Sequence, residues 1–228
     1  MTKTNKSNSP KPKTTFANPI SPTSAAHPSL EALKEEASRC QACSLWANAT
    51  QTVFGEGPTT SAIVFIGEVP GNDEDLAGRP FVGPAGQLFD EVLEEVGLDR
   101  ESVYVTNTVK HFKWEPAAKR RLHKKPSARE AAACRPWLDA EIKAINPRII
   151  VCLGATAAQA ILGRDFRVTA QRGEPLPSAL APIVIATVHP ASILRTPGPE
   201  DRHKAREAFK RDLSVVAFLA RDHDHKKR

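Results

Sequence analysis

The sequence has no long hydrophobic run and only four cysteines among its 228 residues. No apolar stretch reaches the roughly 18 residues that a membrane-spanning helix needs, and no apolar stretch follows the first lysines as it would in a secretory signal. We therefore expect a cytoplasmic protein, in the bacterial cytosol or nucleoid. In such a reducing compartment, cysteines serve as metal ligands or free thiols more often than as disulfides.

Large apolar side chains are almost absent from residues 1–27, which are rich in Ser, Thr, Asn, Pro and Lys. Such a segment buries too little surface to offset the entropy of ordering, so we predict a disordered basic tail. We expect one domain over residues 28–221, because 40% of the chain is hydrophobic, and a charged tail over residues 222–228. The net charge of +6 weakly favours an anionic partner such as nucleic acid.

Strand-like and helix-like segments alternate along this domain. This alternation predicts an α/β fold, a three-layer α/β/α arrangement around a central four-stranded parallel sheet. The predicted strands span 62–67, 102–107, 148–154 and 182–188, and the predicted helices span 29–37, 86–96, 127–145, 155–162 and 200–220.

Polar residues follow the predicted strands, where ligands bind in folds of this kind. They are Glu68, Asn107, the turn at 154–156 and His189. Glu68 is suited to act as a base or charge stabiliser, and the alternative is an ordinary solvated turn. The alternative for His189 is a structural role in its turn. Phe81 lies in the long connector after the first strand, and it either stacks on a ligand or belongs to the core.

The segment from Lys110 to Lys125, KHFKWEPAAKRRLHKK, is strongly basic. Its cations are able to neutralise phosphates, and Phe112 and Trp114 suit stacking on bases. The alternative is a solvated charged loop.

The cysteines do not form a complete metal-binding pattern. Cys40-x-x-Cys43 has no second C-x-x-C partner, and Cys134 lies within a predicted helix. Cys152 lies in the middle of an apolar strand, where cysteine behaves as a small hydrophobic residue. Three cysteines therefore remain, and a metal site would need a fourth donor.

Several motifs in one order resemble the family 4 uracil-DNA glycosylases. They are C-x-x-C, G-E-x-P-G-x-x-E-D, G-R-P-F-V-G-x-A-G, T-N-x-V-K, a later Cys and H-P-x-S-x-L-R, over about residues 29–220. The sequence K-R-R-L-H-K resembles the loop of UdgX-type members, whose loop histidine becomes covalently attached to DNA after uracil is removed. The resemblance implies a uracil-DNA glycosylase-like fold and uracil-containing DNA as partner, single-stranded DNA preferred, for a monomeric enzyme.

The resemblance also implies a role for each matching residue. Phe81 would stack on uracil, and Asn107 would hydrogen-bond its polar edge and reject cytosine. His189 would donate to the uracil oxygen on which negative charge develops. Glu68 would stabilise the sugar cation, and His123 would attack C1′ in place of water. Further uracil-binding positions are Gly67, Val69 and Asn72, and the DNA-binding positions are Lys119, Arg120, Arg121, Ser192 and Arg195.

Two positions depart from the family pattern. Val69 stands where UdgX-type proteins usually have Gln, and Asn72 stands where an acid is common. Because Asn72 cannot act as a general base, the departures favour the route through His123.

The resemblance further implies a [4Fe–4S] cluster with four cysteine ligands. Cys40, Cys43 and Cys134 match three of them, and His111 occupies the position of the fourth. Histidine replaces cysteine in some iron–sulfur centres, so we predict these four residues as ligands. The alternative uses all four cysteines, including Cys152.

The predicted function is that of an iron–sulfur uracil-DNA glycosylase that excises uracil and becomes linked to the abasic sugar through His123. One alternative is a conventional family 4 enzyme that turns over. The other is a non-catalytic module that binds DNA or uracil.

Overall fold

The computed structural model describes residue 22, residues 29–118 and residues 120–226, with no side chains described beyond 221. The predicted disordered tail, apart from residue 22, therefore lies outside the described residues, as does Lys119. Within the described residues, no helix is long and apolar enough to cross a membrane.

A five-stranded sheet forms the centre of the described part, with strand order β2-β1-β5-β7-β6. The first four strands in this order are mutually parallel, as predicted, and the short β6 pairs antiparallel with β7 at the edge. The bounds are Ile63–Gly67 for β1, Tyr104–Asn107 for β2, Ile149–Leu153 for β5, Pro175–Leu176 for β6 and Ile183–Thr187 for β7. The strand β6 was not predicted, because it has only two residues.

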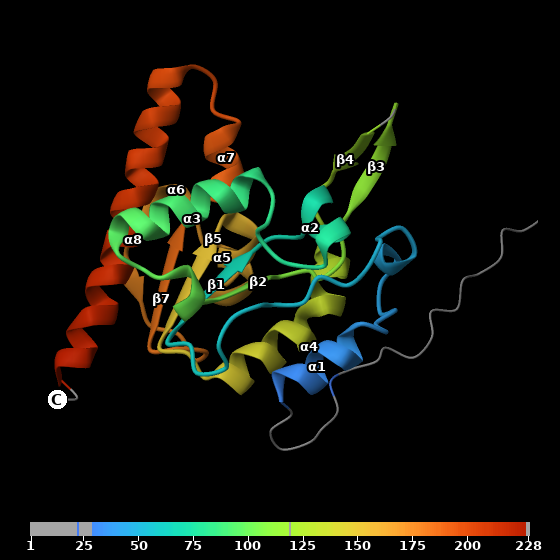
Figure 1. Cartoon of the computed structure of the whole chain (residues 1–228), viewed down its shortest axis with the longest axis horizontal. Coiled ribbons are helices and arrows are strands. Elements are labelled where there is room, and N and C mark those ends of the chain that lie inside the picture. Colours follow the sequence, from blue (N-terminus) through green and yellow to red (C-terminus); the bar gives the residue numbers. More distant parts are fainter. Residues whose placement is uncertain (1–21, 23–28, 119, 227–228) are drawn as a thin grey trace, which may run out of the picture.

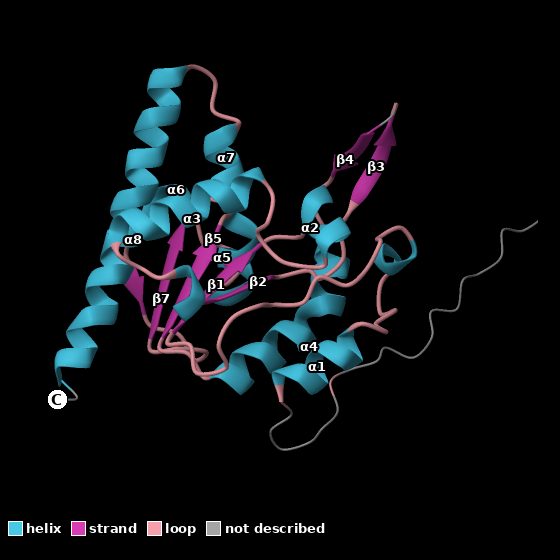
Figure 2. Cartoon of the chain, in the orientation of Figure 1, coloured by secondary structure: helices cyan, strands magenta, loops and turns pink. Residues whose placement is uncertain are grey.

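Helices cover both faces of this sheet, so the predicted three-layer α/β fold is confirmed (Figure 2). The apolar core on one face includes residues of α1 (Leu30–Ala37), α4 (Ala128–Ile145), α5 (Ala155–Leu162) and α6 (Val168–Gln171). The core on the other face includes residues of α3 (Pro84–Val96), α7 (Pro190–Leu194) and α8 (Pro199–Lys226). Successive strand residues serve opposite cores: Val64 packs in the first and Phe65 in the second.

Capping residues explain where several helices begin and end. Ser127 accepts from the Glu130 amide and Glu130 accepts from the Ser127 amide, which is the predicted capping box before α4. Gly97 ends α3 in the left-handed conformation with φ 75°. The helix α8 runs beyond its predicted end to Lys226, so most of the predicted C-terminal tail has helical backbone.

Beyond the short helices α6 and α7, a helix and a hairpin beside the sheet were not predicted. The connector after β1 contains a helix, α2 (Asn72–Ala77), and the basic segment forms an antiparallel hairpin of β3 (Trp114–Ala117) and β4 (Arg120–His123). The hairpin projects from the body beside α2 (Figure 1). Two short 3-10 helices complete the described elements, η1 (Ser44–Ala47) and η2 (Arg100–Ser102).

Candidate active site

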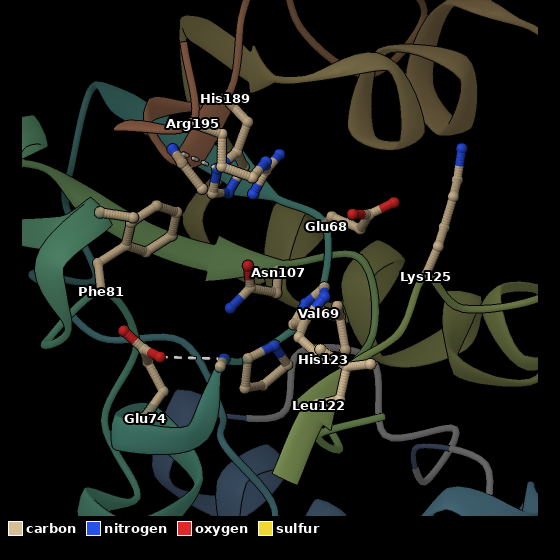
Figure 3. Close-up of a pocket in the computed structure, with 14 residues that line it drawn as sticks. Glu68, Val69, Glu74, Phe81, Asn107, Leu122, His123, Lys125, His189 and Arg195 are labelled. Atoms are coloured by element: carbon tan, nitrogen blue, oxygen red, sulfur yellow. Dashed lines mark hydrogen bonds between the residues drawn. The ribbon is translucent and has the colours of Figure 1, made fainter. Parts of the chain in front are cut away.

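A pocket of about 670 Å³ opens at the carboxyl ends of the parallel strands (Figure 3). This is the location that the strand-end rule predicts. Its lining residues are Glu68, Val69, Pro70, Gly71, Glu74, Phe81, Ala85, Asn107, Leu122, His123, Lys125, His189, Ala191 and Arg195. Glu68, Asn107, His189 and His123, four side chains singled out in the sequence, therefore meet at one cavity.

Glu68 directly follows β1. Its Oε1 accepts a hydrogen bond from the Thr156 hydroxyl, which lies in the first turn of α5. A carboxylate near a helix N-terminus is stabilised by the helix dipole. The contact fixes one carboxylate oxygen and explains why a threonine in the 154–156 turn belongs to the site.

Asn107 is the last residue of β2 and lies opposite Gly67 in the parallel ladder. The asparagine is only 3% exposed. A Cβ on Gly67 would collide with Asn107 Oδ1 and with the ring of Phe81. The glycine is therefore required for the amide and the ring to approach the strand end.

Phe81 belongs to the core and also lies at the pocket, so its position is compatible with both roles that the sequence left open. Its ring is buried in the core beside Phe89, with centroids 5.4 Å apart, and it also lines the pocket. There it lies nearly parallel to the His189 ring, with an interplanar angle of 21° and centroids 6.0 Å apart. Its φ of 58° is unusual for a phenylalanine, so surrounding contacts must maintain this backbone conformation.

Glu74 supplies such contacts, although no role beyond its place in the motif was predicted for it. One oxygen accepts from the Gly71 amide at 2.9 Å, and the other accepts from the Gly83 amide at 2.7 Å. The carboxylate thus joins the starts of α2 and α3 and holds the connector that carries Phe81. An acid three residues after Gly71, at the third position of a helix, was the available signal.

His189 caps α7, and its Nδ1 accepts from the Ala191 amide at 3.2 Å. Burial, reinforced by the nearby Arg195 and His123, lowers the pKa of His189 to about 4. The imidazole is therefore neutral at pH 7, and its proton is on Nε2 because Nδ1 is an acceptor. A neutral N–H donor is suited to stabilise negative charge that develops on a ligand oxygen.

His123 ends β4 and reaches the pocket from the hairpin. Its ring lies 6.0 Å from that of Phe112, and Leu122 and Lys125 line the pocket beside it. Partial burial lowers the pKa of His123, while the carboxylate of Glu68 acts in the opposite direction. The result is a neutral, solvent-accessible imidazole at pH 7 that interacts electrostatically with Glu68.

Arg121 attaches the hairpin to α2. Its guanidinium donates to Asn72 Oδ1 at 2.8 Å and to the buried Asp75 at 2.6 Å, and it lies over the rings of Phe112 and Trp114. These contacts orient the strand that carries His123.

The prediction that Asn72 binds uracil is not supported by this geometry, since its amide oxygen is engaged by Arg121 and it does not line the pocket. Among the predicted DNA-binding residues, Arg195 lines the pocket. Ser192 instead donates to the His189 carbonyl at 2.7 Å, and Arg120 is exposed on β4.

The three cysteines of the predicted cluster belong to one region of the core, in which Cys40 and Cys134 are buried and Cys43 packs against them. Cys40 Sγ accepts from the Trp137 indole at 3.2 Å, and Cys134 Sγ accepts from the Lys110 amide at 3.3 Å. Burial raises the pKa of the Cys134 thiol to about 12. N–H donors around sulfur are typical of iron–sulfur ligands, so this donor chemistry fits a cluster.

The ligand set is nevertheless not assembled as predicted. Among the described residues, no group of three or more His, Cys, Asp or Glu side chains is arranged to hold a metal ion. His111 Nε2 lies 2.8 Å from the Thr52 hydroxyl, and burial lowers the pKa of this histidine to about 4. Cys152 is fully buried in β5 and packs in the core, as expected of a small hydrophobic residue.

Fold and pocket together define an α/β protein with a cavity lined by polar and aromatic side chains at the ends of its parallel strands. A family model described as the uracil DNA glycosylase superfamily matches residues 54–214. The chain belongs to this superfamily.

Among curated proteins, the chain is similar to type-4 uracil-DNA glycosylases. It is 40% identical over 188 residues to that of Thermotoga maritima, covering 82% of this chain and 94% of the relative. It is 39% identical over 192 residues to that of Sulfurisphaera tokodaii, covering 78% and 84% respectively. The type-4 enzyme of Archaeoglobus fulgidus is 36% identical over 198 residues, covering 84% and 93%.

Proposed function

We propose that this protein is a uracil-DNA glycosylase that excises uracil and then becomes covalently linked to the DNA through His123. The observation that carries the proposal is the meeting of Phe81, Asn107, His189 and Glu68 with His123 at one pocket. The type-4 relatives support the excision step. The UdgX-like sequence around His123 supports the covalent step.

In the excision step, the bond between C1′ of the sugar and N1 of uracil breaks, and its electron pair leaves with the base. Phe81 stacks on the ring of the extruded base, and the Asn107 amide pairs with its polar edge. The neutral His189 donates its Nε2 proton in a hydrogen bond to the oxygen that becomes negative. The Glu68 carboxylate stabilises the positive charge on the sugar.

In the covalent step, the lone pair of a neutral His123 ring nitrogen forms a bond to C1′. The proton on the other ring nitrogen passes to a carboxylate, for which Glu68 is the candidate because it interacts electrostatically with this histidine. The lowered pKa of His123 favours this step, since a protonated imidazole has no lone pair to donate.

The predicted [4Fe–4S] cofactor would be held by Cys40, Cys43 and Cys134, with His111 as the proposed fourth ligand. When bound, the cluster would connect the segment after α1 with α4, because Cys40 and Cys134 lie on these segments. For His111 to serve as a ligand through Nε2, its hydrogen bond with the Thr52 hydroxyl would have to break so that this nitrogen could bind iron.

The test is to mix the protein with single-stranded DNA that contains one uracil and to separate the products on a denaturing gel. We expect a slowly migrating adduct, no adduct with His123→Ala, and an unchanged adduct with His203→Ala, a matched exposed histidine on α8. Duplex DNA in a parallel reaction measures the strand preference.

Three results separate the candidate functions. An adduct that depends on His123 supports the proposal. Abasic product without an adduct contradicts the covalent step and identifies a conventional turnover enzyme. Absence of both product and adduct contradicts the glycosylase activity and leaves a binding module.

A further inference from the structure

A buried ion pair lies behind the pocket, between Lys110, in the segment after β2, and Glu141 in α4. Their side chains are only 1% and 0% exposed. Removing two charges from water is costly, and such pairs often stabilise a fold no better than apolar residues of similar volume. Stability alone therefore does not explain why two charged residues are buried here.

The ammonium group of Lys110 contacts the strand end that carries Asn107. Lys110 Nζ donates to the Asn107 carbonyl at 2.8 Å and to the Thr106 hydroxyl at 2.5 Å, and it pairs with Glu141. These contacts use all three donors of the ammonium. Lys110 thus holds the backbone of the residue whose amide faces the pocket.

Glu141 holds the same strand from the side of α4. Its Oε1 accepts from the Tyr104 hydroxyl at 2.8 Å, from the Gly55 amide at 3.0 Å and from the Thr106 hydroxyl at 3.0 Å. The strand β2 lies at the edge of the sheet, beside β1. On its other side, among the described residues, β2 makes only an isolated antiparallel bridge with Glu56, so the contacts with Glu141 add support that the sheet itself does not give.

The residues after β2 are hydrogen-bonded to the residues at the end of β1 that lie at the pocket. The Thr108 amide donates to the Gly67 carbonyl at 2.9 Å, and the Val109 amide donates to the Glu68 carbonyl at 3.0 Å. Asn107 is also confined laterally by Gly67 and Phe81. A shift of its carbonyl would therefore move its amide relative to Phe81 and Glu68.

We propose that Lys110 and Glu141 are positioning residues that fix the Asn107 amide and thereby set the discrimination for uracil. This inference rests on the proposed function, because Asn107 is assigned there to read the polar edge of the base. Neither residue lines the pocket, so both act through Asn107.

The test uses the double variant K110M/E141Q, since either single substitution would strand a buried charge or leave a buried polar group without its partner. Single-turnover excision of uracil is measured in the wild type, in K110M/E141Q, in N107A and in the triple variant. We expect the double variant to be roughly 10–100-fold slower, the loss typical of a small misplacement. In the N107A background the same two substitutions should change the rate by less than about threefold, because coupled residues are not additive.

The pair of Arg172 and Asp212, which joins α8 to the segment before β6, provides the matched control. Any decrease in the excision rate caused by R172M/D212N should be the same in the wild-type and N107A backgrounds. Melting temperature and the absorption near 400 nm show whether each variant is folded and carries its cofactor.

Amide hydrogen exchange over residues 104–109 measures how firmly the end of β2 is held, and it does not depend on enzyme activity. We expect this segment to exchange at least about tenfold faster in K110M/E141Q than in the wild type, because it loses its support. Unchanged exchange, or a rate loss that is equal in the N107A background, overturns the inference. If the wild type excises no uracil, the proposed function fails, and the exchange result still decides whether the ion pair orders β2.

Discussion

The pocket and the cysteine region differ in how completely the fold itself organises them. In the pocket, a neighbouring group holds each central side chain: Thr156 binds Glu68, the Ala191 amide binds His189, and Lys110 binds the Asn107 carbonyl. In the cysteine region, Cys40 and Cys134 accept N–H bonds, but the described side chains form no metal-holding group.

The difference follows from where the residues lie. Glu68, Asn107 and His189 stand at the ends of β1, β2 and β7, whose relative positions are fixed by the ladders of the sheet. Cys40 lies after α1, Cys43 caps η1 and Cys134 lies in α4, and no ladder connects these segments. A site of the first kind is organised by the sheet, whereas the proposed cluster site would be completed by the group that it binds.

The largest effect is expected when the pocket loses a charge. Glu68→Gln should slow uracil excision by about 10³-fold, because the neutral amide neither stabilises the sugar cation nor accepts a proton. Thr156→Val keeps the charge but releases the carboxylate, so its loss should be closer to tenfold. Single-turnover rates measure both, and an equal loss in the two variants would contradict the assignment of charge to Glu68 and positioning to Thr156.

Substitutions in the cysteine region should change the iron content of the protein instead of the chemistry of the pocket. If the proposed cluster is present, Cys134→Ser should remove most of its iron and the absorption near 400 nm, because it deletes a proposed thiolate ligand. Cys152→Ser should keep the iron and lower the melting temperature by about 2–4 °C, as expected for a loss of roughly 1 kcal/mol in the core. Loss of iron in Cys152→Ser would instead favour the set of four cysteines, and His111→Cys against His111→Ala tests the fourth ligand directly.

The sequence was sufficient for the parallel sheet and for the edge at which the pocket forms. Apolar runs such as residues 148–154 define buried strands, and parallel strands place their carboxyl ends together. The sequence could not give β6, because two residues carry no periodicity. The hairpin of β3 and β4 also could not be predicted from the sequence, because its many charged residues show no alternation of apolar and polar side chains.

The missed parts of the site depend on contacts between residues far apart in the chain. Asp75 is fully buried because Arg121, from another element, neutralises it. The same arginine engages Asn72, and so the amide that the sequence suggested for uracil serves the hairpin instead. Spacing along one segment contains no information on such pairings.

Arg121 offers a test of how the hairpin contributes to the pocket. Arg121→Met leaves the buried Asp75 without its cation, which should destabilise the fold by about 3 kcal/mol. Below the melting transition, adduct formation should fall about tenfold more than excision, because His123 loses its support while Phe81, Asn107 and His189 keep theirs. Arg120→Met, on the exposed neighbouring position, is the control, and an equal decline in adduct and excision would show that Arg121 does not act through His123.

The smallest effect concerns pH and the neutral histidine of the pocket. Because the folded-state pKa of His189 is lowered to about 4 from an ordinary 6.5, the unfolded chain binds more protons between these two values. Its contribution to the free energy of unfolding should therefore be constant above pH 6.5 and decline as pH falls from 6.5 toward 4. Denaturant titrations of the wild type and His189→Asn measure this difference, since the substitution should flatten the slope in that window. If the neutral His189 serves excision, the excision rate should show no titration with a midpoint near pH 6.5. A midpoint there would mean that His189 is solvated like an ordinary histidine and is not held neutral by the pocket.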